Sequence, residues 1–165
     1  EKMAKLKEAA NFIIDTSFKA PGELKVEIIR RFIDDKKEET LLVNLVSFGF
    51  KQGIPLDADL VFDVRFIPNP FYIDELRPLN GTNLNVKNYV MQWAESRVFL
   101  DKLYDMVRYL IPYYVREGKS QLIVGVGCTG GKHRSVAMTT ELAARLKADS
   151  HKVVVDHRDI DKDRS

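Results

Sequence analysis

The sequence has little of what marks a secreted, membrane-bound or highly charged protein. Its single cysteine, Cys128, cannot form a disulfide within the chain. No apolar run is long enough to span a membrane, and no signal-peptide pattern stands at the start. The 26 basic and 24 acidic residues nearly balance, so the overall charge does not indicate a nucleic-acid or membrane-surface partner. We therefore expect a cytoplasmic protein with no membrane partner, in which any basic site is local.

The composition is sufficient for one ordinary globular core, with 45% hydrophobic and 30% charged residues. The N-terminal segment differs from the rest. Glu1 is not an initiator methionine, and a short apolar strand precedes a helix that Pro21 is suited to begin. We interpret residues 1–36 as the remnant of a preceding domain with its linker. The main domain is expected at 40–165, beyond a run of charged residues.

The main domain is expected to alternate strands and helices. Apolar runs bounded by turn residues predict strands at 40–48, 60–66, 121–126 and 152–156. Periodic apolar positions predict helices at 86–93, 95–115 and 135–147. Because this alternation favours parallel pairing, the expected fold class is α/β, with a mostly parallel sheet flanked by helices. A phosphate-binding loop is expected between the third strand and the last helix.

The prolines predict where two elements end or bend, and the apolar spacing predicts which face of the long helix is buried. Pro68 and Pro70 should end the second strand, because neither can donate a ladder hydrogen bond. Pro112 is expected to kink the helix at 95–115 or to end it a turn early. Five residues of that helix recur at spacings of three or four and are expected to face the core: Phe99, Leu103, Met106, Leu110 and Tyr114.

The most informative segment is the glycine-rich stretch 125–135, which follows an apolar run and precedes an amphipathic one. Its glycines allow backbone N–H groups to turn toward a common point, and the following helix adds the positive end of its dipole. Lys132 and Arg134 supply full charges within the same loop. These features are typical of a site for phosphate or another anion.

Two nucleotide-binding motifs match this stretch only in part. Gly125-x-Gly127-x-x-Gly130 fits the dinucleotide fingerprint, with Asp156 where a ribose-binding carboxylate would stand, but the further βαβ units of a Rossmann domain do not follow. A Walker A loop is not formed, because His133 stands where Ser or Thr would bind magnesium. No set of metal ligands is predicted.

The stretch also resembles the C-x-x-G-x-x-R-[ST] signature of cysteine-dependent phosphatases, from Cys128 to Ser135. In such an enzyme the Cys128 thiolate would attack phosphorus while Arg134 binds the phosphoryl oxygens. A general acid is also needed, yet the nearest upstream candidates, Asp101 and Asp105, fall within a predicted helix. Cys128 is either a nucleophile or a small residue packed at a strand end, and a phosphatase is the alternative function.

Four blocks of sequence occur in order across the main domain: Ser47–Pro55, Asp63–Pro70, Glu75–Gly81 and Gly127–Ser135. In this combination they closely resemble the RNase adapter family, RapZ and its relative YvcJ. The resemblance implies the C-terminal domain of a bacterial protein whose other half is a P-loop domain that binds and hydrolyses ATP or GTP. This part would then be a non-catalytic regulatory domain without a cofactor of its own, which senses an amino-sugar phosphate. The resemblance also implies a homo-oligomer, with RNA or a protein as further candidate partners.

The resemblance assigns the glycine-rich loop as the sugar-phosphate site. Three of its residues match positions that line the family's pocket: Thr129, Gly130 and Arg134. The remaining candidates in the same loop are Cys128, Gly131, Lys132, His133 and Ser135.

Residues at a neighbouring strand end are expected to complete the pocket. Asp63, Arg65 or Asn69 is placed to meet sugar hydroxyls or an amine. For Asp63 and Arg65 the alternative is an ion pair within the protein. Phe71 stands where enterobacterial family members have a pocket histidine, so the sugar contact there is expected to differ.

RNA binding would use the basic loop with nearby cations, and the candidates for it are Lys51, Arg77, His157 and Arg158. Enterobacterial family members carry a basic cluster at the C-terminus, whereas residues 151–165 here hold four basic and four acidic side chains. Binding that depends on counterion release needs uncompensated cations, which this tail does not offer. For His157 and Arg158 a solvated strand end is the alternative.

Overall fold

The computed structural model describes residues 14, 16–17, 19–22, 24 and 41–162. The strand and helix expected within residues 1–36 lie almost entirely outside the described residues. The chain divides into two compact units, Glu1–Glu38 and Glu39–Ser165, and the fold below is that of the second unit.

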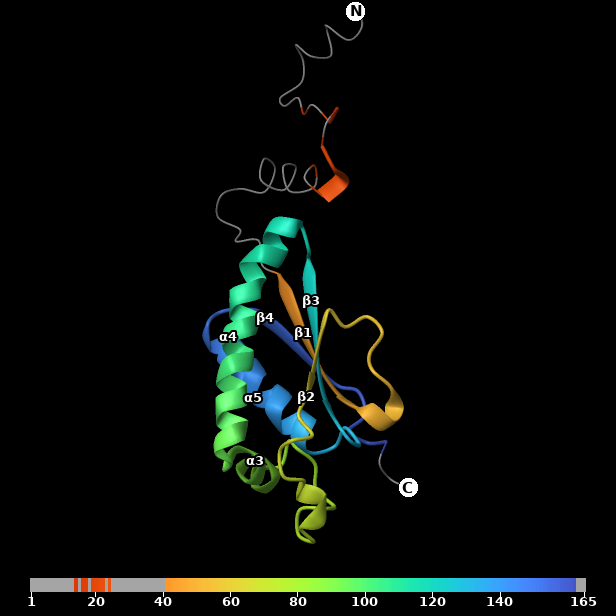
Figure 1. The fold of residues 1–165 in the computed structure, drawn as a ribbon, viewed down its shortest axis with the longest axis vertical. Helices are drawn as coiled ribbons and strands as arrows, with labels where there is room; N and C mark the ends of the chain where they lie inside the picture. The colour runs from red at the N-terminus through yellow and green to blue at the C-terminus, as the bar shows by residue number, and fades with distance from the viewer. Residues whose placement is uncertain (1–13, 15, 18, 23, 25–40, 163–165) are drawn as a thin grey trace, which may run out of the picture. The chain divides into compact units, whose positions relative to one another are not determined.

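A four-stranded, all-parallel sheet forms the centre of the second unit (Figure 1). Its strands are β1 (Leu42–Gly49), β2 (Leu60–Asp63), β3 (Gln121–Cys128) and β4 (Lys152–His157), in the spatial order β2-β3-β1-β4. The expected α/β class with a parallel sheet is therefore confirmed. Because parallel strands end at the same edge, the loops that follow β1, β2 and β3 meet at the carboxyl edge of the sheet.

The strand β2 is shorter than the predicted 60–66. It ends at Asp63, whose Oδ1 accepts a hydrogen bond from the Arg65 N–H at 2.9 Å. This contact turns the chain before it reaches Pro68, because an aspartate side chain that binds the backbone two residues on closes a tight turn.

Three α-helices lie on one side of the sheet in Figure 1: α3 (Leu84–Met91), α4 (Ala94–Glu117) and α5 (Arg134–Ala148). The helix α5 packs on β1, β3 and β4 and also contacts α3 and α4. It carries a nearly continuous buried face, which includes Val136, Met138, Leu142 and Leu146. Two short 3₁₀ helices complete the unit, η1 (Phe50–Gln52) and η2 (Pro70–Tyr72). None of the helices that the structure describes is long and apolar enough to cross a membrane.

The expected stripe of α4 is confirmed in part: Phe99 and Tyr114 pack against the core while partly buried, but the most buried residues lie on a neighbouring stripe. The buried residues of α4 are Ser96, Leu100, Leu103, Val107 and Ile111. Of the predicted stripe only Leu103 is among them, while Met106 is 49% exposed. Apolar residues occupy two neighbouring stripes of α4, so their spacing alone does not decide which stripe packs inward.

The helix does not end a turn early at Pro112, because α4 continues past this residue to Glu117. A kink at Pro112 stays a prediction. The helix ends at Gly118, which adopts a left-handed conformation with φ 87°. The Gly118 N–H bonds carbonyl groups of the last turn, as glycine at a helix C-terminus commonly does. Loss of the proline N–H is thus tolerated within this long helix, while a glycine sets its end.

Candidate functional site

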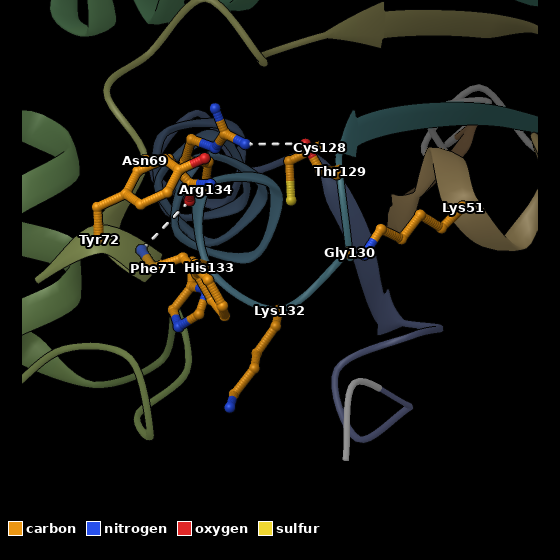
Figure 2. Close-up of a pocket in the computed structure, with 10 residues that line it drawn as sticks. All are labelled: Lys51, Asn69, Phe71, Tyr72, Cys128, Thr129, Gly130, Lys132, His133 and Arg134. Carbon is orange, nitrogen blue, oxygen red and sulfur yellow. Dashed lines mark hydrogen bonds between the residues drawn. The ribbon is translucent and has the colours of Figure 1, made fainter. Parts of the chain in front are cut away.

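An open cavity lies where β3 ends and α5 begins (Figure 2). It has a volume of about 260 Å³ and is called the anion cavity below. Its walls come from the loop after β3, from η1 and from the segment around η2, and the lining residues are Lys51, Asn69, Phe71, Tyr72, Cys128, Thr129, Gly130, Lys132, His133 and Arg134.

Arg134 is the most buried charge of the anion cavity, at 4% exposure. Its Nη1 donates to Arg65 O at 2.9 Å and to Ile67 O at 2.8 Å, and its Nη2 donates to Thr129 Oγ1 at 3.1 Å. A guanidinium has five N–H donors, so the Nε–H and one Nη2–H remain. The buried Nε has no hydrogen-bond partner. Arg134 therefore braces the neighbouring loop while two of its five N–H donors have no partner within the protein.

The burial of Arg134 makes its positive charge unfavourable unless an anion lies nearby. Burial lowers the pKa of its guanidinium and the nearby Arg65 acts in the same direction, while Cys128, Asp63 and Tyr72 act to raise it. An arginine keeps its charge even so, because its ordinary pKa lies far above neutrality. A bound anion would compensate the charge that burial leaves poorly solvated.

The N-terminus of α5 adds further donors to the anion cavity. The helix begins at Arg134, and its N-cap residue, His133, makes no side-chain capping bond. The first turn of a helix leaves N–H groups without intrahelical acceptors, and the helix dipole makes this end positive. Lys51 and Lys132 line the same cavity, whereas none of the lining residues that the structure describes is acidic. The arrangement favours an anion.

His133 is nearly buried beside these cations, at 5% exposure. Burial lowers its pKa, and the neighbouring Lys132 lowers it further, while hydrogen bonding to the backbone of Arg77, Leu76 and Leu79 acts in the opposite direction. The imidazole is therefore neutral at pH 7. Its Nε2 has no hydrogen-bond partner.

The loop shape depends on glycine where chain segments nearly touch. Gly131 has φ +83°, and a Cβ there would lie 2.6 Å from Gly49 N and 2.8 Å from Asp159 Cβ. A Cβ on Gly49 would lie 2.5 Å from the carbonyl carbon of Gly130. Larger residues would clash at either position, so the loop after β3 rests directly on the turn after β1.

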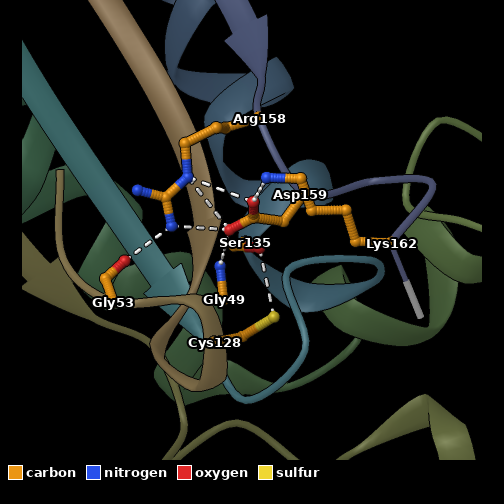
Figure 3. A network of polar contacts seen from close by, with 7 residues as sticks. All are labelled: Gly49, Gly53, Cys128, Ser135, Arg158, Asp159 and Lys162. Atoms are coloured by element: carbon orange, nitrogen blue, oxygen red, sulfur yellow. Dashed lines mark hydrogen bonds and ion pairs between the residues drawn. The ribbon is translucent and has the colours of Figure 1, made fainter.

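A buried carboxylate supports the loop from behind (Figure 3). Asp159 is fully buried, and its Oδ2 accepts a hydrogen bond from the Gly49 N–H at 2.8 Å. Arg158 Nη2 lies 2.7 Å from the same oxygen, and Lys162 Nζ lies 3.0 Å from Oδ1. Burial alone would raise the pKa of this carboxyl, but the bonds from Arg158, Gly49 and Lys162 outweigh it and hold the pKa below its ordinary value.

The sequence reasoning missed the role of Asp159. It counted this residue among the balanced charges of the C-terminal tail, and no motif marks it. A carboxylate two residues after the end of a strand would have been the only signal, since the carboxyl ends of parallel strands converge.

The Cys128 thiol points into the same region and has a neighbour. Its Sγ lies 3.1 Å from Ser135 Oγ, with both side chains buried. Figure 2 shows the Cys128 sulfur on the side of the cavity near Thr129. Ser135 does not line the cavity, and neither does Gly131.

Two of the residues expected to meet the sugar lie outside the anion cavity. Asp63 and Arg65 form an ion pair at 2.6 Å, in which both side chains are nearly half exposed, and Arg65 also stacks over Phe50. The hydrogen bond from Arg65 lowers the pKa of the Asp63 carboxyl. Asn69 does line the cavity, and its Oδ1 accepts a hydrogen bond from the Phe71 N–H at 3.3 Å. The internal ion pair is therefore what the structure shows for Asp63 and Arg65.

The four RNA-binding candidates fall into two groups. Lys51 lines the anion cavity, and Arg77 lines a neighbouring hollow. His157 Nδ1 instead lies 2.8 Å from Ser47 Oγ, and Arg158 bonds Asp159 and Gly53 O. These last two contacts are internal. Among the described residues, no group of three or more His, Cys, Asp or Glu side chains is arranged to hold a metal ion.

Comparison with known proteins gives the family. Relatives called nucleotide-binding proteins include one from Caldanaerobacter subterraneus subsp. tengcongensis, 56% identical over 160 residues, which are 97% of this chain and 56% of the relative. Another, from Staphylococcus aureus strain JH9, is 51% identical over 160 residues, which are 96% of this chain and 52% of the relative. The chain thus spans about half the length of the curated relatives it matches. Residues 41–161, which contain the whole anion cavity, match the RapZ C-terminal domain, so the chain belongs to the RapZ family.

Proposed function

We propose that the second unit is a regulatory domain that binds a phosphorylated amino sugar in the anion cavity. The observation that carries the proposal is the buried Arg134, whose Nε has no hydrogen-bond partner. Lys51 and Lys132 line the same cavity, and none of the lining residues that the structure describes is acidic. A phosphomonoester carries about −1.5 to −2 charge and offers three acceptor oxygens, which suit these donors. The amino-sugar part of the proposal is supported by the family resemblance.

The alternative is a cysteine-dependent phosphatase. The contact between Cys128 and Ser135 favours it, because a hydroxyl beside the sulfur would stabilise a thiolate. A phosphatase also needs an acid to protonate the leaving group, and none of the described lining residues is a carboxylic acid. We therefore favour binding without turnover. The test is hydrolysis of p-nitrophenyl phosphate, for which Cys128→Ser must abolish any activity that belongs to this site.

The rest of the function belongs to the whole protein. Relatives carry the name nucleotide-binding protein, and this chain covers about half of each. We propose that ATP or GTP binds in the other half and that the whole protein is a cytoplasmic homo-oligomer. RNA is a second candidate ligand, because Lys51 and Lys132 are basic residues at an open cavity. Salt-dependent retention of RNA that weakens in Lys51→Gln would support it.

Calorimetric titration of the 165-residue chain with glucosamine 6-phosphate and inorganic phosphate tests the main proposal. Lys51→Gln removes an exposed lysine of the cavity and should weaken binding about threefold or more. Arg134→Ala should abolish binding, and circular dichroism checks that this variant folds. Lys102→Gln is the matched control, since Lys102 is an exposed lysine on α4 that does not line the cavity. Equal affinity in all four proteins would refute the proposal.

A further inference from the structure

A second cavity lies beside the anion cavity. It has a volume of about 310 Å³ and is lined by Phe71, Asp74, Arg77, Pro78, Lys132 and His133. Phe71, Lys132 and His133 line both cavities, so the two share a wall. Small-molecule sites usually measure about 300–1,000 Å³. Each cavity alone lies near the lower limit of that range, whereas the two together lie well within it.

The charges of the two cavities leave one cation uncompensated. Lys51 and Arg134 line only the anion cavity, and together they match the charge of one phosphomonoester, about −1.5 to −2. Arg77 lines only the second cavity, where it pairs with Asp74 at 2.8 Å. Lys132 lines both cavities, and its charge remains for a further anionic group.

The shared wall holds polar groups that lack partners. Lys132 Nζ donates one long hydrogen bond, to Arg77 O at 3.3 Å, although an ammonium group has three N–H donors. His133 is 5% exposed, and its Nε2 has no hydrogen-bond partner. The Lys132 ammonium group therefore keeps donors for a ligand outside the loop at Thr129.

Phe71 gives the shared wall a flat apolar surface. The Arg77 guanidinium lies over its ring, 5.2 Å from the centroid, and Arg77 Nε donates to Phe71 O at 3.0 Å. Figure 2 shows the Phe71 ring next to His133, with the Lys132 side chain extending away from Cys128. Phe71 is 45% exposed, so part of its apolar surface is available to the uncharged body of a ligand.

We propose that the two cavities form one site for a sugar that carries two phosphate groups. One phosphate binds Arg134 and Lys51, the second binds Lys132 with Arg77, and the sugar between them packs on Phe71. This inference rests on the proposed function and extends it from a singly to a doubly phosphorylated ligand.

Calorimetric titration with glucosamine 6-phosphate and glucosamine 1,6-bisphosphate tests the second subsite. The bisphosphate should bind about threefold or more tightly than the monophosphate, because the added contacts are charge-assisted but partly exposed. Two variants of the second cavity should change this preference in opposite directions. Asp74→Asn releases Arg77 from its ion pair and should increase the preference, whereas Arg77→Gln should remove it. Arg108→Gln is the control, since Arg108 is an exposed arginine of α4 that lines neither cavity.

The possible results separate this inference from the proposed function. If the monophosphate binds in a manner that depends on Lys51, and the bisphosphate binds no more tightly, the second subsite is wrong while the proposed function stands. If Asp74→Asn and Arg77→Gln leave the preference unchanged, the second phosphate does not lie in the second cavity and the inference is again overturned. If neither sugar binds, both proposals fail.

Discussion

The Asp159 carboxylate should contribute measurably to the stability of the second unit, and Asp159→Asn tests this. Asparagine keeps the shape of the side chain and one acceptor oxygen, so it can retain the bond from the Gly49 N–H. It loses the negative charge that attracts Arg158 and Lys162. These cations are 26% and 54% exposed, so each ion pair is expected to contribute up to about 1 kcal/mol. The hydrogen bond from the Gly49 N–H is also weaker to a neutral amide than to a carboxylate. We therefore expect Asp159→Asn to lower the free energy of unfolding by about 1–3 kcal/mol at pH 7.

The effect of Asp159→Asn on the unfolding free energy should also depend on pH, in a direction that the pKa of Asp159 determines. The pKa of Asp159 in the folded protein lies below its ordinary value of 3.8. The stabilisation is therefore fully present above pH 3.8 and is lost as the pH falls through the folded-state value. The difference in unfolding free energy between the original chain and Asp159→Asn should narrow toward pH 3.

Urea unfolding followed by tryptophan fluorescence is a suitable assay. Trp93 is the only tryptophan of the chain and lies in the second unit, so its signal reports on that unit. Asp156→Asn serves as the control, because Asp156 is an exposed carboxylate on β4. Equal stability of Asp159→Asn and the original chain at pH 7, or a difference that is the same at pH 7 and pH 3, would refute the role assigned to Asp159.

Three further predictions follow from the packing and from the buried histidine. Gly131→Ala should lower the melting temperature and weaken phosphate binding, because a left-handed conformation costs about 1–2 kcal/mol for alanine and the new Cβ would lie 2.6 Å from Gly49 N; unchanged melting in calorimetry would contradict this. Leu103→Ala should cost about 2–5 kcal/mol in urea unfolding, whereas Met106→Ala should cost less than about 0.5 kcal/mol, and the reverse order would show that the stripe expected from the sequence is the packed one. Because the pKa of His133 is lowered in the folded state, stability should fall as the pH drops below the ordinary value of 6.5, and His133→Gln should reduce that slope; an equal slope in both proteins would argue against a buried neutral imidazole.

The strands and the loop could be predicted from the sequence because their signals are local. Apolar runs located all four strands, and the glycines with Lys132 and Arg134 located the anion cavity. The buried face of α4 could not be chosen this way. Leu100 and Val107 lie one residue beyond the expected Phe99 and Met106, and only contact with the other helices and the sheet distinguishes the two stripes.

Contacts between distant segments account for the remaining differences at the site. Arg134 was expected as a ligand contact, and nothing in the sequence indicated that three of its N–H groups would bond Arg65 O, Ile67 O and Thr129 Oγ1. Those carbonyl groups lie nearly seventy residues earlier in the chain, and no local pattern shows that they approach. The assignment of particular residues as ligand contacts stays a prediction.

The arrangement of segments at the carboxyl edge of the sheet also determines when the anion cavity can form during synthesis of the chain. The loop after β3 rests on Gly49, and Gly49 is bound by Asp159, the second residue after β4. A ribosome must therefore release nearly the whole second unit before the anion cavity has all its supports. An incomplete chain could pair β1 with β3 and still lack the support that Asp159 gives to the anion cavity. An anion that binds the complete cavity stabilises only molecules in which all three segments are in contact.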